Sequence, residues 1–206
     1  EIQLSGAFYT ERNLSFKPFF NINDIISSYS DLNKNAYLFF ATIKRKNITN
    51  NTQSLFAFSP FDVLNGNQNF KINQGDIIKV YNKDEIKKLV SQNPDANLLQ
   101  TPELNFNKSS KLPDIVGDIN QLVRSLSIRI EGAVGSPGQY LIASELPLSQ
   151  VILISGGLNN DANLTTIEVT SPKKEVNGNI NLLSEKINIQ NLSKDEFLIT
   201  PGSLIR

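Results

Sequence analysis

The sequence predicts an α+β chain built from two β-rich modules in tandem, each a mixed sheet packed on a short helix. Three observations lead to this prediction. The chain matches itself at a fixed offset, each copy contains strand-like alternation of apolar and polar residues, and a polar stretch with several prolines separates the copies. We expect a first module over residues 1–88, a linker with a short helix over residues 89–126, and a second module over residues 127–206.

The internal repeat appears when the chain is shifted against itself by 126 residues. Residues 2–8 (IQLSGAF) then fall on residues 128–134 (IRIEGAV), and the apolar positions that follow stay in phase. One inserted residue restores the phase near the end of each copy. Agreement at both ends indicates a duplicated unit. Two glycine pairs mark those ends, Gly6 with Gly132 and Gly75 with Gly202.

Each copy reads as a hairpin, a short helix, a long strand, a variable excursion, a turn and a last strand. Ile22, Ile25 and Ile26 are spaced as on one face of a helix, which we expect near residues 22–30 and again near 148–155. A mixed sheet wrapped on a single helix has this order, and the β-grasp is a familiar example. The strands expected in the first copy cover residues 2–8, 14–17, 36–43, 54–58 and 77–81.

The region between the copies has a different character. Residues 84–90 have the pattern of a short amphipathic helix. Residues 91–113 contain three prolines among Asn, Gln and Ser, which is a linker composition. Residues 114–124 can form a second short helix. The basic run Lys44-Arg45-Lys46 in the first copy is interpreted as a solvated strand end.

The turn-forming residues of the second copy have structural explanations. Pro137 presets φ and Gly138 accepts a positive φ, so the pair predicts a type II turn before Tyr140. Gly156 and Gly157 are expected to end the helix, because a left-handed residue is needed there. Gly202, like Gly75 beside Asp76 in the first copy, is expected to turn the chain into the last strand; these roles are conformational rather than ligand-binding.

The composition argues against most classes of catalytic and metal-binding site. The chain has no His and no Cys, so it lacks the commonest general base, the usual nucleophile systems and most zinc ligands. Its formal net charge is zero, which gives it no electrostatic reason to bind nucleic acid. The glycine-rich segments lack the Lys-Ser/Thr of a phosphate loop, and Asn159-Asn160-Asp161 is better explained as a turn than as a cation site. We therefore predict no enzyme, no cofactor and no metal. A carboxylate-dependent glycan-processing enzyme is the weakest of the alternatives that stay open.

The second copy carries a family resemblance. Residues 128–140 (IRIEGAVGSPGQY) are followed by residues 148–152 (LSQVI), by residues 155–158 (SGGL), and by Asp161-Ala162-Asn163. This order resembles the soluble-ligand-binding β-grasp family, in which Ala162 also matches the pattern. The tandem arrangement of the two copies is similar to that in the periplasmic part of outer-membrane polysaccharide export proteins. The chain departs from the pattern at Glu11-Arg12, at Tyr29-Ser30-Asp31 and at Ser203, where the family usually has Asp, as at Asp76.

The resemblance implies a function. It implies a non-catalytic, periplasmic, outer-membrane-associated part of a bacterial polysaccharide export protein, whose modules pack between the subunits of a ring-like homo-oligomeric conduit. The polysaccharide would be the transported substrate, and an inner-membrane polysaccharide co-polymerase is implied as a further partner. The absence of Met and the strand-like start at Glu1 predict that the chain is a piece of a longer protein. The alternative is a receptor module for a soluble glycan or small ligand.

Overall fold

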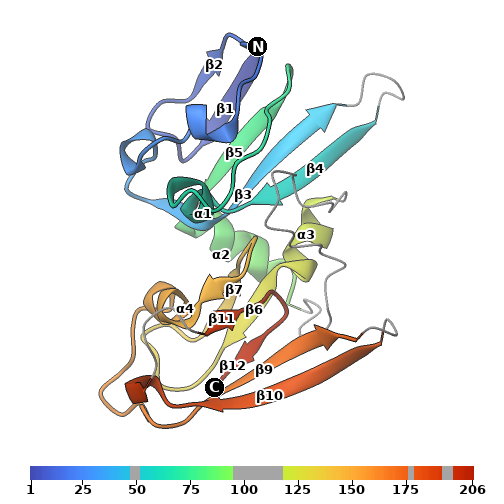
Figure 1. Cartoon of the computed structure of the whole chain (residues 1–206). Helices are drawn as coiled ribbons and strands as arrows, with labels where there is room; N and C mark the ends of the chain where they lie inside the picture. The colour runs from blue at the N-terminus through green and yellow to red at the C-terminus, as the bar shows by residue number, and fades with distance from the viewer. Residues whose placement is uncertain (47–51, 95–117, 176–178, 192–196) are drawn as a thin grey trace. The chain divides into compact units, whose positions relative to one another are not determined.

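The computed structural model describes residues 1–46, 52–94, 118–175, 179–191 and 197–206 (Figure 1). The chain divides into two compact units, one built on residues 1–89 and one on residues 123–206. Each unit contains a five-stranded mixed sheet with short helices, so the predicted α+β class is confirmed.

The first unit has the strand order β2-β1-β5-β3-β4. The parallel pair β1–β5 lies at its centre, and the other neighbours are antiparallel. The connections carry two 3₁₀ turns, η1 (Ile22–Asp24) and η2 (Tyr29–Asp31), and the helix α1 (Pro60–Leu64), while α2 (Lys83–Ser91) follows the sheet. The strands are β1 (Ile2–Gly6), β2 (Arg12–Leu14), β3 (Ala36–Lys46), β4 (Gln53–Phe58) and β5 (Ile77–Asn82).

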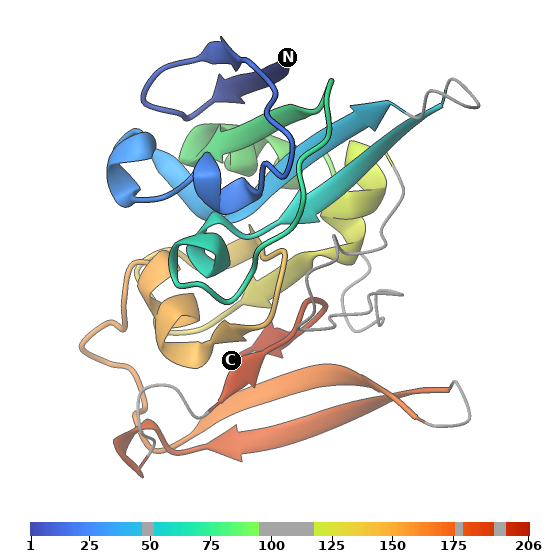
Figure 2. The ribbon, with the colours of Figure 1, turned by 45° about the horizontal axis from the view of Figure 1, so that its top comes forward.

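The second unit follows helix α3 (Ile119–Ser125) and has the strand order β10-β9-β12-β6-β7. A separate two-stranded sheet pairs β8 (Leu146–Pro147) with β11 (Leu198–Ile199), next to the helix α4 (Leu148–Ile154). Figure 2 shows β9 and β10 as a long two-stranded ribbon beside the short β12. The five strands are β6 (Ser127–Ile130), β7 (Gly138–Leu141), β9 (Ile167–Lys174), β10 (Ile180–Ile187) and β12 (Leu204–Ile205); η3 spans Ile189–Asn191.

The two sheets repeat each other at the level of individual residue pairs. Read in reverse, the second strand order places β7, β6, β12, β9 and β10 where the first unit has β2, β1, β5, β3 and β4. The register repeats at the same offset of 126 residues, or of 127 after the inserted residue. This agreement supports the predicted duplication. Four matched pairs are Ile2–Leu14 with Ile128–Tyr140, Gln3–Ile77 with Arg129–Leu204, Phe8–Leu32 with Val134–Leu158, and Asn21–Lys71 with Pro147–Leu198.

The helix expected near residues 22–30 is replaced by the two 3₁₀ turns η1 and η2. The carboxylate of Asp24 accepts the Asn21 N–H at 2.8 Å, and that of Asp31 accepts the Ser27 and Ser28 N–H groups at 2.9 Å. These side chains bind backbone donors locally and so compete with a continuous helix. The second unit has no such acids in this segment and forms α4. The strand expected over residues 14–17 instead ends at Leu14.

A left-handed glycine lies at or just after the end of the first strand in each unit. Gly6 has φ of 82°, and Gly132 has φ of 86°. A Cβ on Gly6 would lie 2.2 Å from the carbonyl oxygen of Val80, which accepts the Ala7 N–H at 2.7 Å. A Cβ on Gly132 would meet nothing nearer than the Arg206 carbonyl carbon at 4.0 Å. A residue with a side chain would therefore be strained by the positive φ at both positions, but it would clash with neighbouring backbone only at Gly6.

We expect Gly6→Ala to destabilise the protein more than Gly132→Ala. A side chain at positive φ costs about 1 kcal/mol at either site. At Gly6 the backbone must also move away from Val80, which should bring the total to about 3 kcal/mol or more. Urea unfolding followed by circular dichroism measures both losses. Equal losses in the two variants would contradict the steric argument.

Candidate functional site

The residues singled out from the sequence lie at chain reversals spread over both units. Gly6 is the last residue of β1, Gly132 lies just after the end of β6, and Gly156 and Gly157 follow α4. Ala162 closes a turn by donating its N–H to the Asn159 carbonyl at 3.1 Å. The remaining members of the set are Gly75, Asp76 and Gly202, which precede β5 and β12, and Pro137, Gly138 and Tyr140, which lie before or in β7.

The turns before β5 and β12 have the same geometry. Gly75 has φ of 86° and Gly202 has φ of 87°. In each turn the following residue donates its N–H across the turn at 3.2 Å, Asp76 to Asn73 and Ser203 to Thr200. A positive φ at the third position with this hydrogen bond defines a type II turn, which favours glycine there. Both turns aim the last strand into the centre of its sheet.

The end of α4 packs closely on the loop after β6. Gly156 and Gly157 are both left-handed, with φ of 88° and 83°. The Gly157 N–H donates to Ile152 at 2.9 Å, and the Gly157 carbonyl accepts the Gly135 N–H at 3.0 Å. A Cβ on Gly135 would lie 2.9 Å from the Gly156 carbonyl oxygen. These glycines allow two backbone segments to approach closely and leave no side chains there to bind a ligand.

The type II turn predicted at Pro137-Gly138 is wrong. Gly138 has φ of 153°, far from the value near +80° that such a turn requires, and it begins β7 opposite Ile130. The first unit has Arg12 at the matching place, opposite Leu4. The Tyr140 hydroxyl donates to the Ser136 carbonyl at 2.5 Å, and burial raises the pKa of Tyr140.

Arg45 is not the solvated strand end that its sequence suggested. Its guanidinium donates two hydrogen bonds to the carboxylate of Asp76, Nε to Oδ1 at 2.8 Å and Nη2 to Oδ2 at 2.6 Å. The Asp76 side chain has no exposed surface, and Oδ2 also accepts the Asn73 N–H at 2.8 Å. Arg45 further donates to the Lys71 carbonyl at 3.2 Å. Lys44 and Lys46, by contrast, are exposed.

The second unit replaces this ion pair by hydroxyl groups at the same positions. Ser171 stands in β9 where Arg45 stands in β3, and Ser203 stands where the first unit has Asp76. Their hydroxyl oxygens are 2.7 Å apart, and Thr200 lies 3.2 Å from Ser203. A buried carboxylate requires a paired cation, so the two members must change together.

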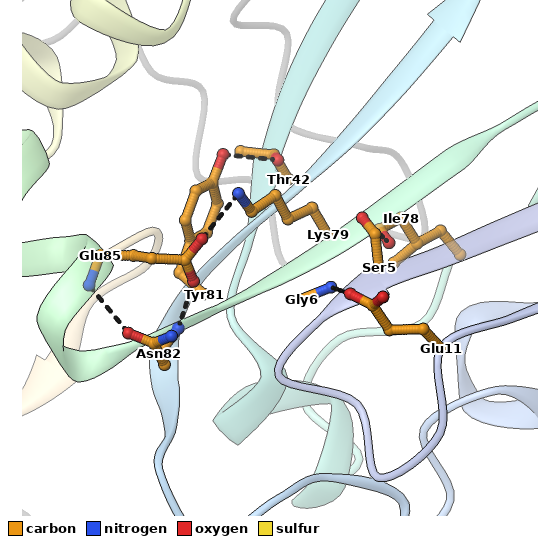
Figure 3. A network of polar contacts seen from close by, with 9 residues as sticks. All are labelled: Ser5, Gly6, Glu11, Thr42, Ile78, Lys79, Tyr81, Asn82 and Glu85. Atoms are coloured by element: carbon orange, nitrogen blue, oxygen red, sulfur yellow. Dashed lines mark hydrogen bonds and ion pairs between the residues drawn. The ribbon is translucent and has the colours of Figure 1, made fainter.

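A second polar network joins β5 to the start of α2 (Figure 3). Lys79 lies 2.8 Å from the Glu85 carboxylate and 4.7 Å above the Tyr81 ring. Asn82 and Glu85 cap the helix reciprocally: the Asn82 N–H donates to Glu85 at 2.9 Å, and the Glu85 N–H donates to the Asn82 side chain at 2.8 Å. The Tyr81 hydroxyl lies 3.2 Å from that of Thr42. Figure 3 also shows the Glu11 carboxylate accepting the Gly6 N–H at 2.5 Å.

The ionisation of this network suits a structural role. Partial burial acts to raise the pKa of Glu85, but the hydrogen bonds from Lys79 and Asn82 and the charges of nearby lysines lower it overall. Burial raises the pKa of Tyr81. A general base works best when its pKa lies near the working pH, and both shifts move these groups away from neutrality. The network therefore anchors α2 rather than providing proton transfer.

The exposed large apolar side chains differ in kind between the two units. Among the described residues of the first unit they are all aromatic, Tyr9, Phe19 and Tyr29. Among those of the second unit they are all aliphatic, and three of them lie on the sheet-edge strand β10, the set that we call the edge surface: Ile180, Leu182 and Leu183. Every residue of β10 but the last is exposed, whereas its counterpart β4 exposes only Gln53. The edge surface and the exposed aromatics are the two candidate binding features, and the sequence patterns singled out neither.

In the part of the chain that the structure describes, no group of three or more Asp, Glu, His or Cys side chains could hold a metal ion. Within the same residues, no helix is long and apolar enough to span a membrane. No protein-family model matches this chain, and no curated protein sequence matches it.

A double-mutant cycle tests the ion pair. We expect Arg45→Ser to cost about 3 kcal/mol, because it leaves the Asp76 charge buried without a partner. Asp76→Ser should cost less, because the Arg45 side chain is 22% exposed and can reach water. The double variant, which reproduces Ser171 and Ser203, should recover part of the loss, with a coupling of at least about 1 kcal/mol in urea unfolding. Additive losses would contradict the pairing.

The Glu85 contacts predict an acid-sensitive contribution to stability. Because the pKa of Glu85 is lower in the folded chain than its usual 4.5, its contribution is complete above that value and disappears as the pH falls through the lower folded pKa. Glu85→Gln should therefore lose stability at pH 7. The loss should stay below about 1 kcal/mol, because the Lys79 and Glu85 side chains are 38% and 31% exposed. Urea unfolding of both proteins from pH 7 to pH 3 should show their difference shrinking in acid; a constant difference would refute the assignment.

Proposed function

We propose that this chain is a non-catalytic part of a bacterial polysaccharide export protein, located in the periplasm and associated with the outer membrane. In this proposal its two modules pack against other copies of themselves around a conduit. The observation that carries the proposal is the tandem pair of units with one strand order and one register, joined to the motif resemblance of the second unit. The lack of His and Cys in the sequence agrees with a role in assembly rather than in chemistry.

The edge surface supports contact between copies. An exposed edge strand presents unpaired backbone N–H and C=O groups that can hydrogen-bond to a strand of another molecule. Isolated folded proteins usually blunt such edges with charge or proline, yet the first five residues of β10, 180–184 (INLLS), carry neither, and its charged residues, Glu185 and Lys186, come after them. Leu182 is 52% exposed and Ile180 is 45% exposed. Pairing of this strand with the sheet of a neighbouring subunit would cover both its apolar side chains and its backbone.

A receptor for a soluble glycan or small ligand is the second candidate. The observation that favours it is the exposed aromatic set of the first unit, in which Tyr9 is 78% exposed and Tyr29 is 58% exposed. Flat aromatic side chains offer a large contact area at a low entropic cost. A receptor would bind its ligand as a single copy, whereas the export proposal requires copies to meet. Assembly in the native cell therefore discriminates between the two.

Cysteine cross-linking of the full-length protein in its native envelope tests the assembly. Leu182→Cys is combined in turn with Gln139→Cys on β7, Asn13→Cys on β2 and Gln53→Cys on β4, which lie on the other sheet edges. This chain contributes no cysteine of its own. If edges meet head to tail, one pair should give a ladder of oligomers while each single variant gives none, because such contacts join different faces. Leu182→Cys with Lys87→Cys, on helix α2, is the matched control.

Gene deletion is the companion measurement. The export proposal predicts that surface polysaccharide disappears when the gene is removed and returns with the wild-type copy. If no pair cross-links and the deletion leaves surface polysaccharide intact, the export proposal fails and the receptor takes its place.

A further inference from the structure

Phe19 occupies a conformation that its side chain disfavours. It is the one non-glycine residue with positive φ in the described part of the chain, at 67°. The Phe20 N–H donates to the Lys17 carbonyl at 3.2 Å, so Lys17-Pro18-Phe19-Phe20 forms a type II turn with Phe19 at its third position. Glycine is the favoured residue at that position, and a bulky aromatic one is strained there.

The Phe19 side chain makes little contact with the rest of the molecule that could offset this strain. The side chain is 82% exposed, the highest value among the exposed large apolar residues of the described chain. Its recorded ring contact is with Lys71, whose Nζ lies 5.9 Å from the ring centroid. An exposed contact between a cation and an aromatic ring is weak. Strain that the fold does not need is a mark of a functional position.

The second unit shows that the fold does not require this pair. At the same offsets it has Glu145 in place of Phe19 and Leu198 in place of Lys71. The strand pairing beside the turn is nevertheless kept, since Asn21 pairs with Lys71 as Pro147 pairs with Leu198. The aromatic ring and the cation are thus additions to a backbone frame that forms without them.

We propose that the turn of Phe19, with Lys17 and Lys71, is a contact for an acidic polysaccharide. The exposed ring offers a flat apolar face to the C–H face of a sugar ring, and the Lys71 ammonium group beside it, with that of Lys17 in the same turn, would pair with sugar carboxylates. Lys17 and Lys71 are both exposed. The acidic residue nearest to this turn in the sequence is Asp24, whose carboxylate accepts the Asn21 N–H at 2.8 Å. This inference rests on the proposed function, because it names the class of polymer that the chain contacts.

The turn suits a glycan better than a lipid surface. Phe19 is its one highly exposed apolar ring, because Phe20 packs against the core of the first unit. A single apolar group gives only marginal membrane attachment. An aromatic ring with a cation 5.9 Å from its centroid matches the chemistry of an acidic sugar residue, which has an apolar face and a carboxylate. A weak contact of this kind gains strength when several copies hold one polymer, as in an oligomer.

Titration of the purified chain with hexagalacturonate, an acidic probe, tests the proposal by calorimetry. Phe19→Gly should weaken binding by at least about fivefold. It should also raise Tm by about 2 °C, because glycine relieves the strain. The rise in Tm separates loss of a contact from loss of the fold. Lys71→Gln should weaken binding as well, and binding should fall with added salt.

Two matched controls accompany these variants. Leu153→Ser removes an exposed apolar residue of the second unit that lies outside the edge surface, and Lys87→Gln removes an exposed lysine of α2. Both should bind hexagalacturonate as the wild type does, and isomaltohexaose, a neutral probe, should bind weakly to every protein. The proposal is overturned if the wild type does not bind hexagalacturonate, if Phe19→Gly binds it with the affinity of the wild type, or if Phe19→Gly lowers Tm.

The outcomes also separate this inference from the proposed function. Binding of phosphatidylglycerol vesicles that depends on Phe19, without binding of hexagalacturonate, would replace the glycan by a lipid surface. Cross-linked ladders and lost surface polysaccharide in the deletion strain, with hexagalacturonate binding absent, would reject the contact and keep the export role. Hexagalacturonate binding that depends on Phe19, with surface polysaccharide intact after deletion, would keep the contact and reject export.

Discussion

The parallel pairing of the first and last strands is the constraint on which each unit depends. In the first unit β1 lies beside β5, and in the second β6 lies beside β12. A parallel pair cannot be closed by a hairpin and needs a long crossover. Here the crossover carries a long antiparallel hairpin and the short helices or turns, so the rest of the unit is arranged around the central pair. Left-handed Gly75 and Gly202 bring the chain back into it.

Because the strand pairing is the same in both copies, their side chains can differ wherever backbone hydrogen bonds are not involved. Polar groups are buried beside the last strand of each unit, and in both units they bind each other. The first unit uses the pair Arg45–Asp76, and the second uses the hydroxyl pair Ser171–Ser203 at the same place. The charged version satisfies its carboxylate with a cation, whereas the neutral version needs only a hydrogen bond between hydroxyls. Divergence of this kind changes surface and charge while it leaves the strand order intact.

The two copies also differ in the kind of apolar side chain that they expose. Aromatic side chains are exposed on the first unit and aliphatic side chains on the second. Aliphatic residues on an unpaired edge strand suit contact with another protein, where apolar area and backbone hydrogen bonds are covered together. An exposed aromatic ring beside a lysine, as at Phe19 and Lys71, suits an acidic ligand. An assembled conduit that contacts its polymer would require both kinds of surface.

The sequence by itself determined the α+β class and the position of most strands of the first unit, because alternation of apolar residues and glycine placement are local signals, and its self-match indicated the repeat. It did not determine that residues 22–31 form two 3₁₀ turns, because the capping by Asp24 and Asp31 overrides a helical spacing of isoleucines. Only the tertiary structure decided that Arg45 reaches Asp76 and that Phe19 lies beside Lys71. These contacts join residues more than 30 positions apart in the chain. They depend on how strands pair, and strand pairing brings together side chains that no local pattern connects.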